Sequence, residues 1–273
     1  MGMICRMMVG TALVLTAIAA PSTVVFAQDE NDAQRSARWK DLQHAIFAER
    51  SVRDGSGLVE LDAPVRALDA ALVPISLTIK GNAQVRGLYL VIDENPAPLA
   101  GHFTFGPDSD PHALKLRVRV NAYTNIHAVL ETRDGQLYAV ARFVKASGGC
   151  SAPAGADENE ALRDIGHMKL HLLQAFNAGE PMEAQLMIRH PNFNGMQMNQ
   201  VTRLVTPPRF IRTIDVSYDG AQVLHVDSDI SLSTDPVITF GFLPQEKAKL
   251  QVVVRDTSNA SFSDSFEVPA PAG

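Results

Sequence analysis

Short runs in which apolar and polar residues alternate, separated by turn-forming residues, recur along most of this chain. The clearest run lies within residues 113–122, where alternate positions carry Leu114, Leu116, Val118 and Val120. The intervening positions place Lys115, Arg117 and Arg119 on the opposite face. A period of two is typical of a β-strand that buries one face, so the chain is predicted to be mainly β.

Seven short runs of this kind are found before residue 146. They cover 58–61, 72–80, 85–94, 102–106, 113–122, 125–132 and 136–145. Gly, Pro, Asn and Asp separate them, and Asp134-Gly135 is a strong hairpin signal. Strands this short and this closely spaced favour an antiparallel β-sandwich.

A second set of runs follows residue 181. It covers 183–190, 209–218, 221–226, 229–231, 237–242, 249–256 and 261–268, with Asp219-Gly220 as a tight turn. We therefore predict two sandwich domains, residues 28–147 and 181–273. The segment 148–180 joins them.

Two segments have helical spacing instead. Residues 28–50 are predicted to form an N-terminal helix whose apolar stripe covers a sheet or core: Trp39, Leu42, Ile46 and Phe47. Residues 158–176 are predicted to form a bridging helix, because Leu162, Ile165, Met168 and Leu172 recur three and four residues apart.

The N-terminus has the pattern of an export signal. Arg6 precedes an apolar stretch at residues 8–20, and the small residue Ala27 marks the expected cleavage point. We expect residues 1–27 to be removed and the mature protein to be periplasmic or secreted. No later segment has the length of a membrane helix. The net charge of −6 argues against nucleic acid as a partner.

The sequence has two cysteines, and Cys5 leaves with the signal. Cys150 then has no intramolecular partner, which in an exported protein points to a reactive thiol or to an intermolecular disulfide. It lies among small residues: Ser147, Gly148, Gly149, Ser151 and Ala152. Without bulky apolar residues, this segment is predicted to be an exposed, flexible arm. A buried, inert cysteine is the alternative.

The charges near Cys150 in the sequence predict modest reactivity. Lys145 is the nearby cation, whereas Asp157, Glu158 and Glu160 oppose ionisation of the thiol. A partner protein is then expected to supply the activation.

Other groupings give weaker signals. His167 and His171, four apart on the predicted helix, lack a third metal ligand, and Met196 and Met198 near His190 are a candidate Cu(I) site. Solvated and packing roles account for both groups, so no metal site and no cofactor are assigned. No motif for nucleophilic, zinc-dependent or phosphate chemistry is found, and no enzymatic activity is expected.

Several motifs resemble the SoxY and SoxZ subunits of the bacterial sulfur-oxidation carrier, joined in one chain as in the SoxYZ-like carriers associated with quinoprotein dehydrogenases. In the first half they are Trp39 and Phe47, Val59-Glu60-Leu61-Asp62-Ala63-Pro64, Ala71-Leu72-Val73-Pro74-Ile75 and Val144-Lys145-Ala146-Ser147-Gly148-Gly149-Cys150. In the second half they are Met187-Ile188-Arg189-His190-Pro191, Pro208-Arg209-Phe210-Ile211 and Thr234-Asp235-Pro236-Val237-Ile238-Thr239-Phe240.

This resemblance implies two immunoglobulin-like sandwiches packed on each other and a sulfur intermediate carried covalently on Cys150. It implies sulfur-oxidation enzymes or a quinoprotein dehydrogenase system as partners. SoxY ends in a Gly-Gly-Cys-Gly-Gly tail, whereas Cys150 is internal and Pro153 follows it. A segment tethered at both ends has less reach than a tail. The alternative is a non-catalytic adaptor or copper module that docks to the dehydrogenase.

Overall fold

A computed structural model of the chain describes residue 2 and residues 24–81, 84–153, 158–199 and 202–268. Most of the predicted signal peptide, residues 1–27, lies outside this set. The chain divides into two units, residues 1–37 and 38–273. The helix α1 (Val24–Phe47) begins in the first unit, and all the strands belong to the second.

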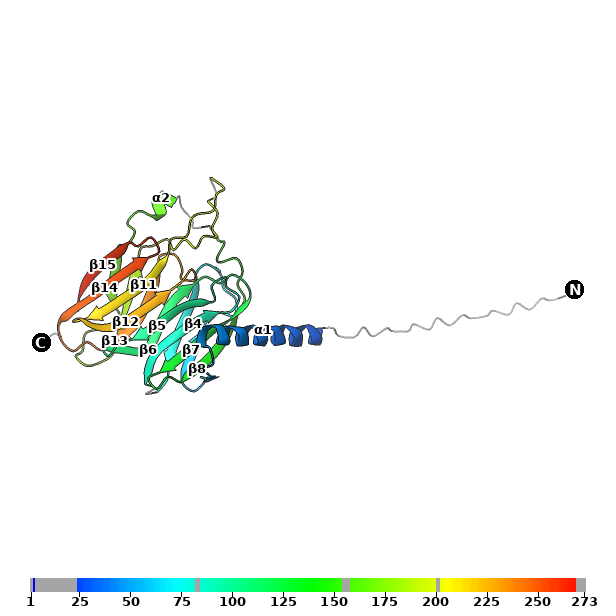
Figure 1. Ribbon diagram of the computed structural model, residues 1–273, viewed down its shortest axis with the longest axis horizontal. Helices are drawn as coiled ribbons and strands as arrows, with labels where there is room; N and C mark the ends of the chain where they lie inside the picture. The colour runs from blue at the N-terminus through cyan, green and yellow to red at the C-terminus, as the bar shows by residue number, and fades with distance from the viewer. Residues whose placement is uncertain (1, 3–23, 82–83, 154–157, 200–201, 269–273) are drawn as a thin grey trace. The chain divides into compact units, whose positions relative to one another are not determined.

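The second unit is built from two β-sheets. The larger sheet has the order β1-β8-β7-β4-β5-β12-β11-β14-β15, and the smaller has β2-β3-β6-β13-β10-β9 (Figure 1). The larger sheet contains β1 (Val52–Asp54), β4 (Val85–Ile92), β5 (Leu99–Phe105), β7 (Thr124–Thr132), β8 (Leu137–Val144), β11 (Ile211–Tyr218), β12 (Ala221–Ser228), β14 (Ala248–Asp256) and β15 (Ser261–Val268). The smaller contains β2 (Val59–Asp62), β3 (Val73–Ile79), β6 (Ser109–Val118), β9 (Met168–Leu172), β10 (Met182–Ile188) and β13 (Val237–Phe242).

Alternation in the sequence corresponds to alternation in burial. In β3 every second side chain is buried, starting from Val73, and β10 repeats the pattern from Met182. Buried side chains from both sheets form a continuous apolar cluster that spans the two halves and includes Leu88, Phe103 and Phe240. The expectation of a mainly β fold built from immunoglobulin-like sandwiches is confirmed.

The two halves of the chain share both sheets. Strand β5 of the first half pairs antiparallel with β12 of the second, and β6 pairs antiparallel with β13. Each sheet therefore continues from one half into the other through main-chain hydrogen bonds. We call these two contacts the inter-half pairing.

Two glycines permit the inter-half pairing. At Gly106 an added Cβ would lie 1.6 Å from the carbonyl oxygen of Gln222, and at Gly241 it would lie 2.4 Å from that of Asp110. Both obstacles are backbone atoms, which cannot rotate away as a side chain does. No residue larger than glycine fits either position without moving a strand.

The part of α1 that belongs to the second unit, residues 38–47, packs against the larger sheet through the predicted apolar stripe. Phe47 packs with Val129 and Leu137, and Ile46 lies against the same group. The Trp39 ring stacks on His127 with centroids 3.6 Å apart. The helix ends at Phe47 rather than at residue 50, and Ala48 has a positive φ of 52°.

The bridging segment differs from its prediction. Helix α2 (Glu158–Ala161) is a single turn, and Met168–Leu172 form strand β9 at the edge of the smaller sheet. The predicted helix through residue 176 is therefore wrong. Met168, Leu170 and Leu172 also fit a period of two, and pairing with β10 decides between the two patterns.

Two short segments also differ from the prediction. Residues 229–231 form a turn rather than a strand, and β1 was not predicted. Strand β1 is three residues long and pairs parallel with β8, so its own sequence carries little periodic signal.

The inter-half pairing gives a stability prediction. Gly106→Ala is expected to lower the free energy of unfolding by about 3 kcal/mol, the upper range for overpacking an interior, because the new Cβ collides with the Gln222 carbonyl. Urea unfolding followed by circular dichroism measures the change. Gly57→Ala, where nothing lies within 4 Å of the added Cβ, is the control and should change stability by less than about 0.5 kcal/mol. Equal effects of the two substitutions would contradict the account.

Candidate functional site

The Cys150 side chain is fully buried, with 0% of its surface exposed. Gly149 is buried as well, whereas Ser147 and Ser151 are exposed and Ala152 is half-buried. The prediction of an exposed arm is therefore wrong for the cysteine itself. Residues 154–157, which complete the small-residue stretch, lie outside the described residues.

Backbone hydrogen bonds hold the segment in place on its N-terminal side. The Gly148 amide donates to the Asn121 carbonyl at 2.8 Å, and the Gly149 amide donates to the Val120 carbonyl at 3.0 Å. A Cβ at Gly149 would lie 2.1 Å from the carbonyl oxygen of Ala70. The glycine is required here by close approach of the main chain, and not only by flexibility.

The second half of the chain fixes the other side of the segment. Two amides of the β10–β11 loop, residues 189–210, donate to its carbonyls. Asn194 Nδ2 lies 2.7 Å from the Cys150 oxygen, and Gln197 Nε2 lies 3.2 Å from the Ala152 oxygen. Asn194 and Gln197 are themselves buried. The cysteine segment, residues 147–153, is thus held by hydrogen bonds to both halves of the chain.

The side chain of Arg119 is buried in the same region. It directly follows β6, and 1% of its surface is exposed. Nη1 donates to the Leu232 carbonyl at 2.6 Å and to the Ile230 carbonyl at 3.4 Å. Nη2 donates to Thr234 Oγ1 at 2.7 Å and to the Pro191 carbonyl at 3.5 Å.

Burial and charge act on Cys150 in opposite directions. Burial raises the pKa of the Cys150 thiol above its ordinary value, and the positive charge of Arg119 lowers it in part. Burial also lowers the pKa of Arg119 to about 10, so the guanidinium stays charged at neutral pH. The thiol is therefore neutral at neutral pH, and its charged neighbour is Arg119 rather than the predicted Lys145.

The alternation in residues 113–122 predicted the wrong environment for Arg119. Strand β6 ends at Val118, and the Arg119 amide leaves the strand to donate to the Ser231 carbonyl at 2.7 Å. Beyond the strand the period of two no longer applies. No sequence signal marks this arginine, because its partners, three main-chain carbonyls and the Thr234 hydroxyl, belong to the distant second half.

The candidate metal ligands His167 and His171 do not share a helix. His167 lies outside any helix and His171 lies in β9, so the two are not one turn apart. Both ring nitrogens of His190 are engaged, one with the Asn192 amide and one with Asp256. Met198 is 44% exposed. Among the described residues, no cluster of three His, Cys, Asp or Glu suits a metal.

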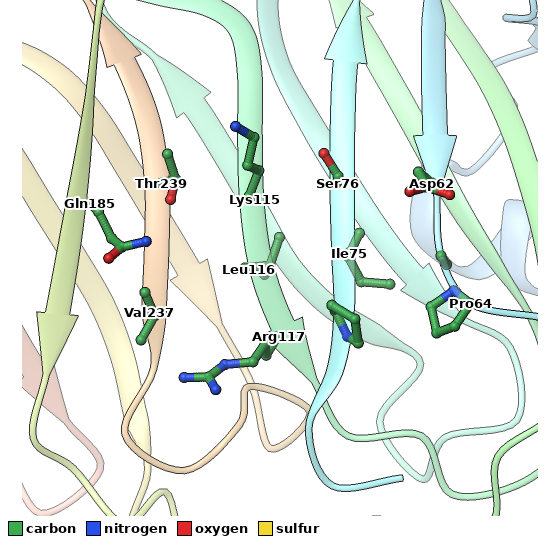
Figure 2. Close-up of a pocket in the computed structure, with 12 residues that line it drawn as sticks. Asp62, Pro64, Ile75, Ser76, Lys115, Leu116, Arg117, Gln185, Val237 and Thr239 are labelled. Carbon is green, nitrogen blue, oxygen red and sulfur yellow. The ribbon is translucent and has the colours of Figure 1, made fainter. Parts of the chain in front are cut away.

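A groove of about 660 Å³ crosses the outer face of the smaller sheet. Figure 2 shows Lys115 and Arg117 of β6 between Ser76 of the first half and Gln185 and Thr239 of the second. Lys115 is paired with Glu183 at 2.9 Å. Cys150 does not line this groove.

Each half of the chain matches a different family model. Residues 43–150 match the family model described as sulfur oxidation protein SoxY, and residues 170–267 match the model described as sulphur oxidation protein SoxZ. The chain is a fusion of a SoxY domain with a SoxZ domain. The SoxY match ends at Cys150, and the inter-half pairing joins the SoxY half to the SoxZ half.

Solved structures with similarity to the chain include a sulfur carrier protein SoxY from Chlorobium limicola f thiosulfatophilum. It is 22% identical, with a TM-score of 0.37, over 43% of this chain and 98% of that one. A superoxide reductase (neelaredoxin) from Ignicoccus hospitalis is 14% identical, with a TM-score of 0.28, over 41% of this chain and 86% of that one. No curated protein matched the chain. Among the described residues, no helix is long and apolar enough to cross a membrane.

The hydrogen bonds that hold the cysteine segment predict how fast Cys150 is labelled. In the native protein Ellman's reagent should react slowly with this thiol, and in urea it should react at once. Asn194→Ala removes the bond to the Cys150 carbonyl and should accelerate native labelling about fivefold, the equivalent of about 1 kcal/mol. Asn177→Ala, which removes an exposed amide that bonds Glu180, is the matched control. Equal labelling rates for both variants would show that Asn194 does not hold the segment.

Proposed function

We propose that this chain is a periplasmic sulfur carrier that binds a sulfur intermediate covalently through Cys150 and presents it to partner enzymes. The observation that carries the proposal is the position of Cys150, the single cysteine of the mature chain, at the end of the SoxY match and against the SoxZ half. Sulfur-oxidation proteins are the partners that the two domains suggest. In this proposal the partner enzymes supply the catalytic groups.

Carriage requires the cysteine segment to open. Cys150 is buried, and among the described residues four hydrogen bonds join its segment to the rest of the fold: two main-chain bonds, from Gly148 and Gly149, and two amide bonds, from Asn194 and Gln197. Ser151 and Pro153 at its C-terminal side are exposed. Opening from that side exposes the thiol to a partner while both sheets stay folded. In the closed state, the burial protects an attached sulfur from solvent and from unrelated thiols.

Sulfur loading tests this proposal directly. The reduced mature chain, starting at Gln28, is incubated with inorganic polysulfide, and its intact mass is measured after excess reagent is removed. We expect an increase equal to one or more sulfur atoms that a thiol reductant reverses. Cys150→Ser should show none, because the mature chain has no other cysteine. Failure of the unsubstituted protein to acquire sulfur, both here and when isolated from its native periplasm, would contradict the proposal.

The burial of Cys150 favours a second candidate function. A fully buried cysteine can serve packing alone and carry no group. The chain would then be an adaptor that docks to a quinoprotein dehydrogenase. Replacing the native gene by one encoding Cys150→Ser separates the two functions. A carrier loses oxidation of reduced sulfur compounds with its fold unchanged, as measured by circular dichroism, whereas an adaptor retains its cellular activity. An intermolecular disulfide through Cys150 requires the same opening as carriage.

A further inference from the structure

The guanidinium of Arg119 is a buried charge held by neutral groups. Among the described residues, its hydrogen bonds go to three carbonyl oxygens and to the Thr234 hydroxyl. Its Nε, also buried, has no hydrogen-bond partner in the described structure. Burying a cation without a carboxylate costs several kcal/mol, so its presence calls for an explanation beyond packing.

The main chain brings Arg119 and Cys150 to the same place. Val120, the next residue after Arg119, accepts the Gly149 amide through its carbonyl, and Gly149 immediately precedes the cysteine. Negative charge on Cys150 acts to raise the pKa of Arg119, against the larger lowering by burial. Among the described residues, Arg119 is likewise the charged group that acts on Cys150.

We propose that Arg119 is the counter-charge of Cys150, which stabilises negative charge on that sulfur when the thiol ionises and when the sulfur carries an anionic adduct. The part concerning the adduct rests on the proposed carrier function, whereas the part concerning the thiol does not. A persulfide is a stronger acid than a thiol, so a cysteine loaded with sulfur ionises at a lower pH than the free thiol at the same position. Arg119 lets the closed segment hold the persulfide anion out of water. It is a positioning residue, since the bond to sulfur forms at Cys150.

A pH profile of alkylation separates ionisation from access. Iodoacetamide is uncharged and reacts with the thiolate, so the midpoint of its rate against pH reports ionisation of Cys150 and the plateau reports access. Arg119→Met should raise the midpoint by about one pH unit, which lowers the thiolate fraction about tenfold below the midpoint. Arg119→Lys keeps the charge and should restore a midpoint near that of the unsubstituted chain.

Arg117→Met is the control for this experiment. Arg117 lies two residues away on β6 and lines the outer groove, so its loss should leave the midpoint unchanged. A merely structural Arg119 would give changes in stability without a rise of the midpoint in Arg119→Met. A midpoint in Arg119→Met equal to or below that of the unsubstituted chain would overturn the proposal.

A second measurement keeps Arg119 in place, in case its variants do not fold. Cys150→Asp and its neutral isostere Cys150→Asn test a negative charge beside the arginine, and Cys150→Lys and Cys150→Met test a positive one; urea unfolding of all four variants is measured at about pH 7. Burial disfavours a charge of either sign, as it raises the pKa of the Cys150 thiol. If Arg119 is the counter-charge, the Asp variant loses less stability relative to the Asn variant than the Lys variant loses relative to the Met variant. An equal or larger loss for the Asp variant would overturn the proposal.

These outcomes are independent of sulfur carriage. Both experiments use the unloaded chain, so their failure removes the counter-charge and leaves the carrier function open. If the chain acquires no sulfur from polysulfide but Arg119→Met raises the alkylation midpoint as expected, only the carrier function is removed. If the counter-charge and the carrier function both hold, the sulfur-loaded Arg119→Met variant should lose its sulfur to a thiol reductant faster than the sulfur-loaded Arg119→Lys variant.

Discussion

Main-chain pairing between the SoxY half and the SoxZ half is the constraint on which the rest of the structure depends. Through β5–β12 and β6–β13 each sheet runs across both halves, and buried side chains from both form a continuous cluster. The pairing leaves so little space that Gly106 and Gly241 accept no larger residue. The register in which β5 pairs with β12 and β6 with β13 therefore fixes the position of one half against the other.

The environment of Cys150 follows from this arrangement. Arg119 directly follows β6 of the SoxY half, and its guanidinium lies among carbonyls of the SoxZ half, including that of Leu232. Asn194 reaches from the SoxZ half to the cysteine segment. A thiol that the sequence places on an open arm is instead buried beside a positive charge, in a segment that four hydrogen bonds among the described residues join to the rest of the fold. That combination suits a carrier which protects its cargo between encounters and releases it by local opening.

The sequence predicts the strands well because a half-buried strand repeats every two residues, and most pairing strands carry that signal. The prediction from sequence is wrong where tertiary contacts determine the secondary structure or the direction of a side chain. Met168–Leu172 fit two periods, and only the edge of β10 makes them a strand. Arg119 follows an alternating run, but beyond the end of β6 its direction depends on the SoxZ half. The small residues around Cys150 predict a flexible segment, whereas the glycine at position 149 reflects close contact with the main chain of Ala70. Nothing local in the sequence distinguishes these two uses of glycine.

The central claim is that Cys150 is reached by local opening of its segment, with both sheets intact. Amide hydrogen exchange measures this most directly, because the Gly148 and Gly149 amides are bonded to the Asn121 and Val120 carbonyls and are released when the segment opens. We predict that these two amides exchange with an opening free energy well below that of β-strand amides in the core, and that Cys150 is labelled with the same opening free energy. Exchange of both amides only through global unfolding would contradict the account.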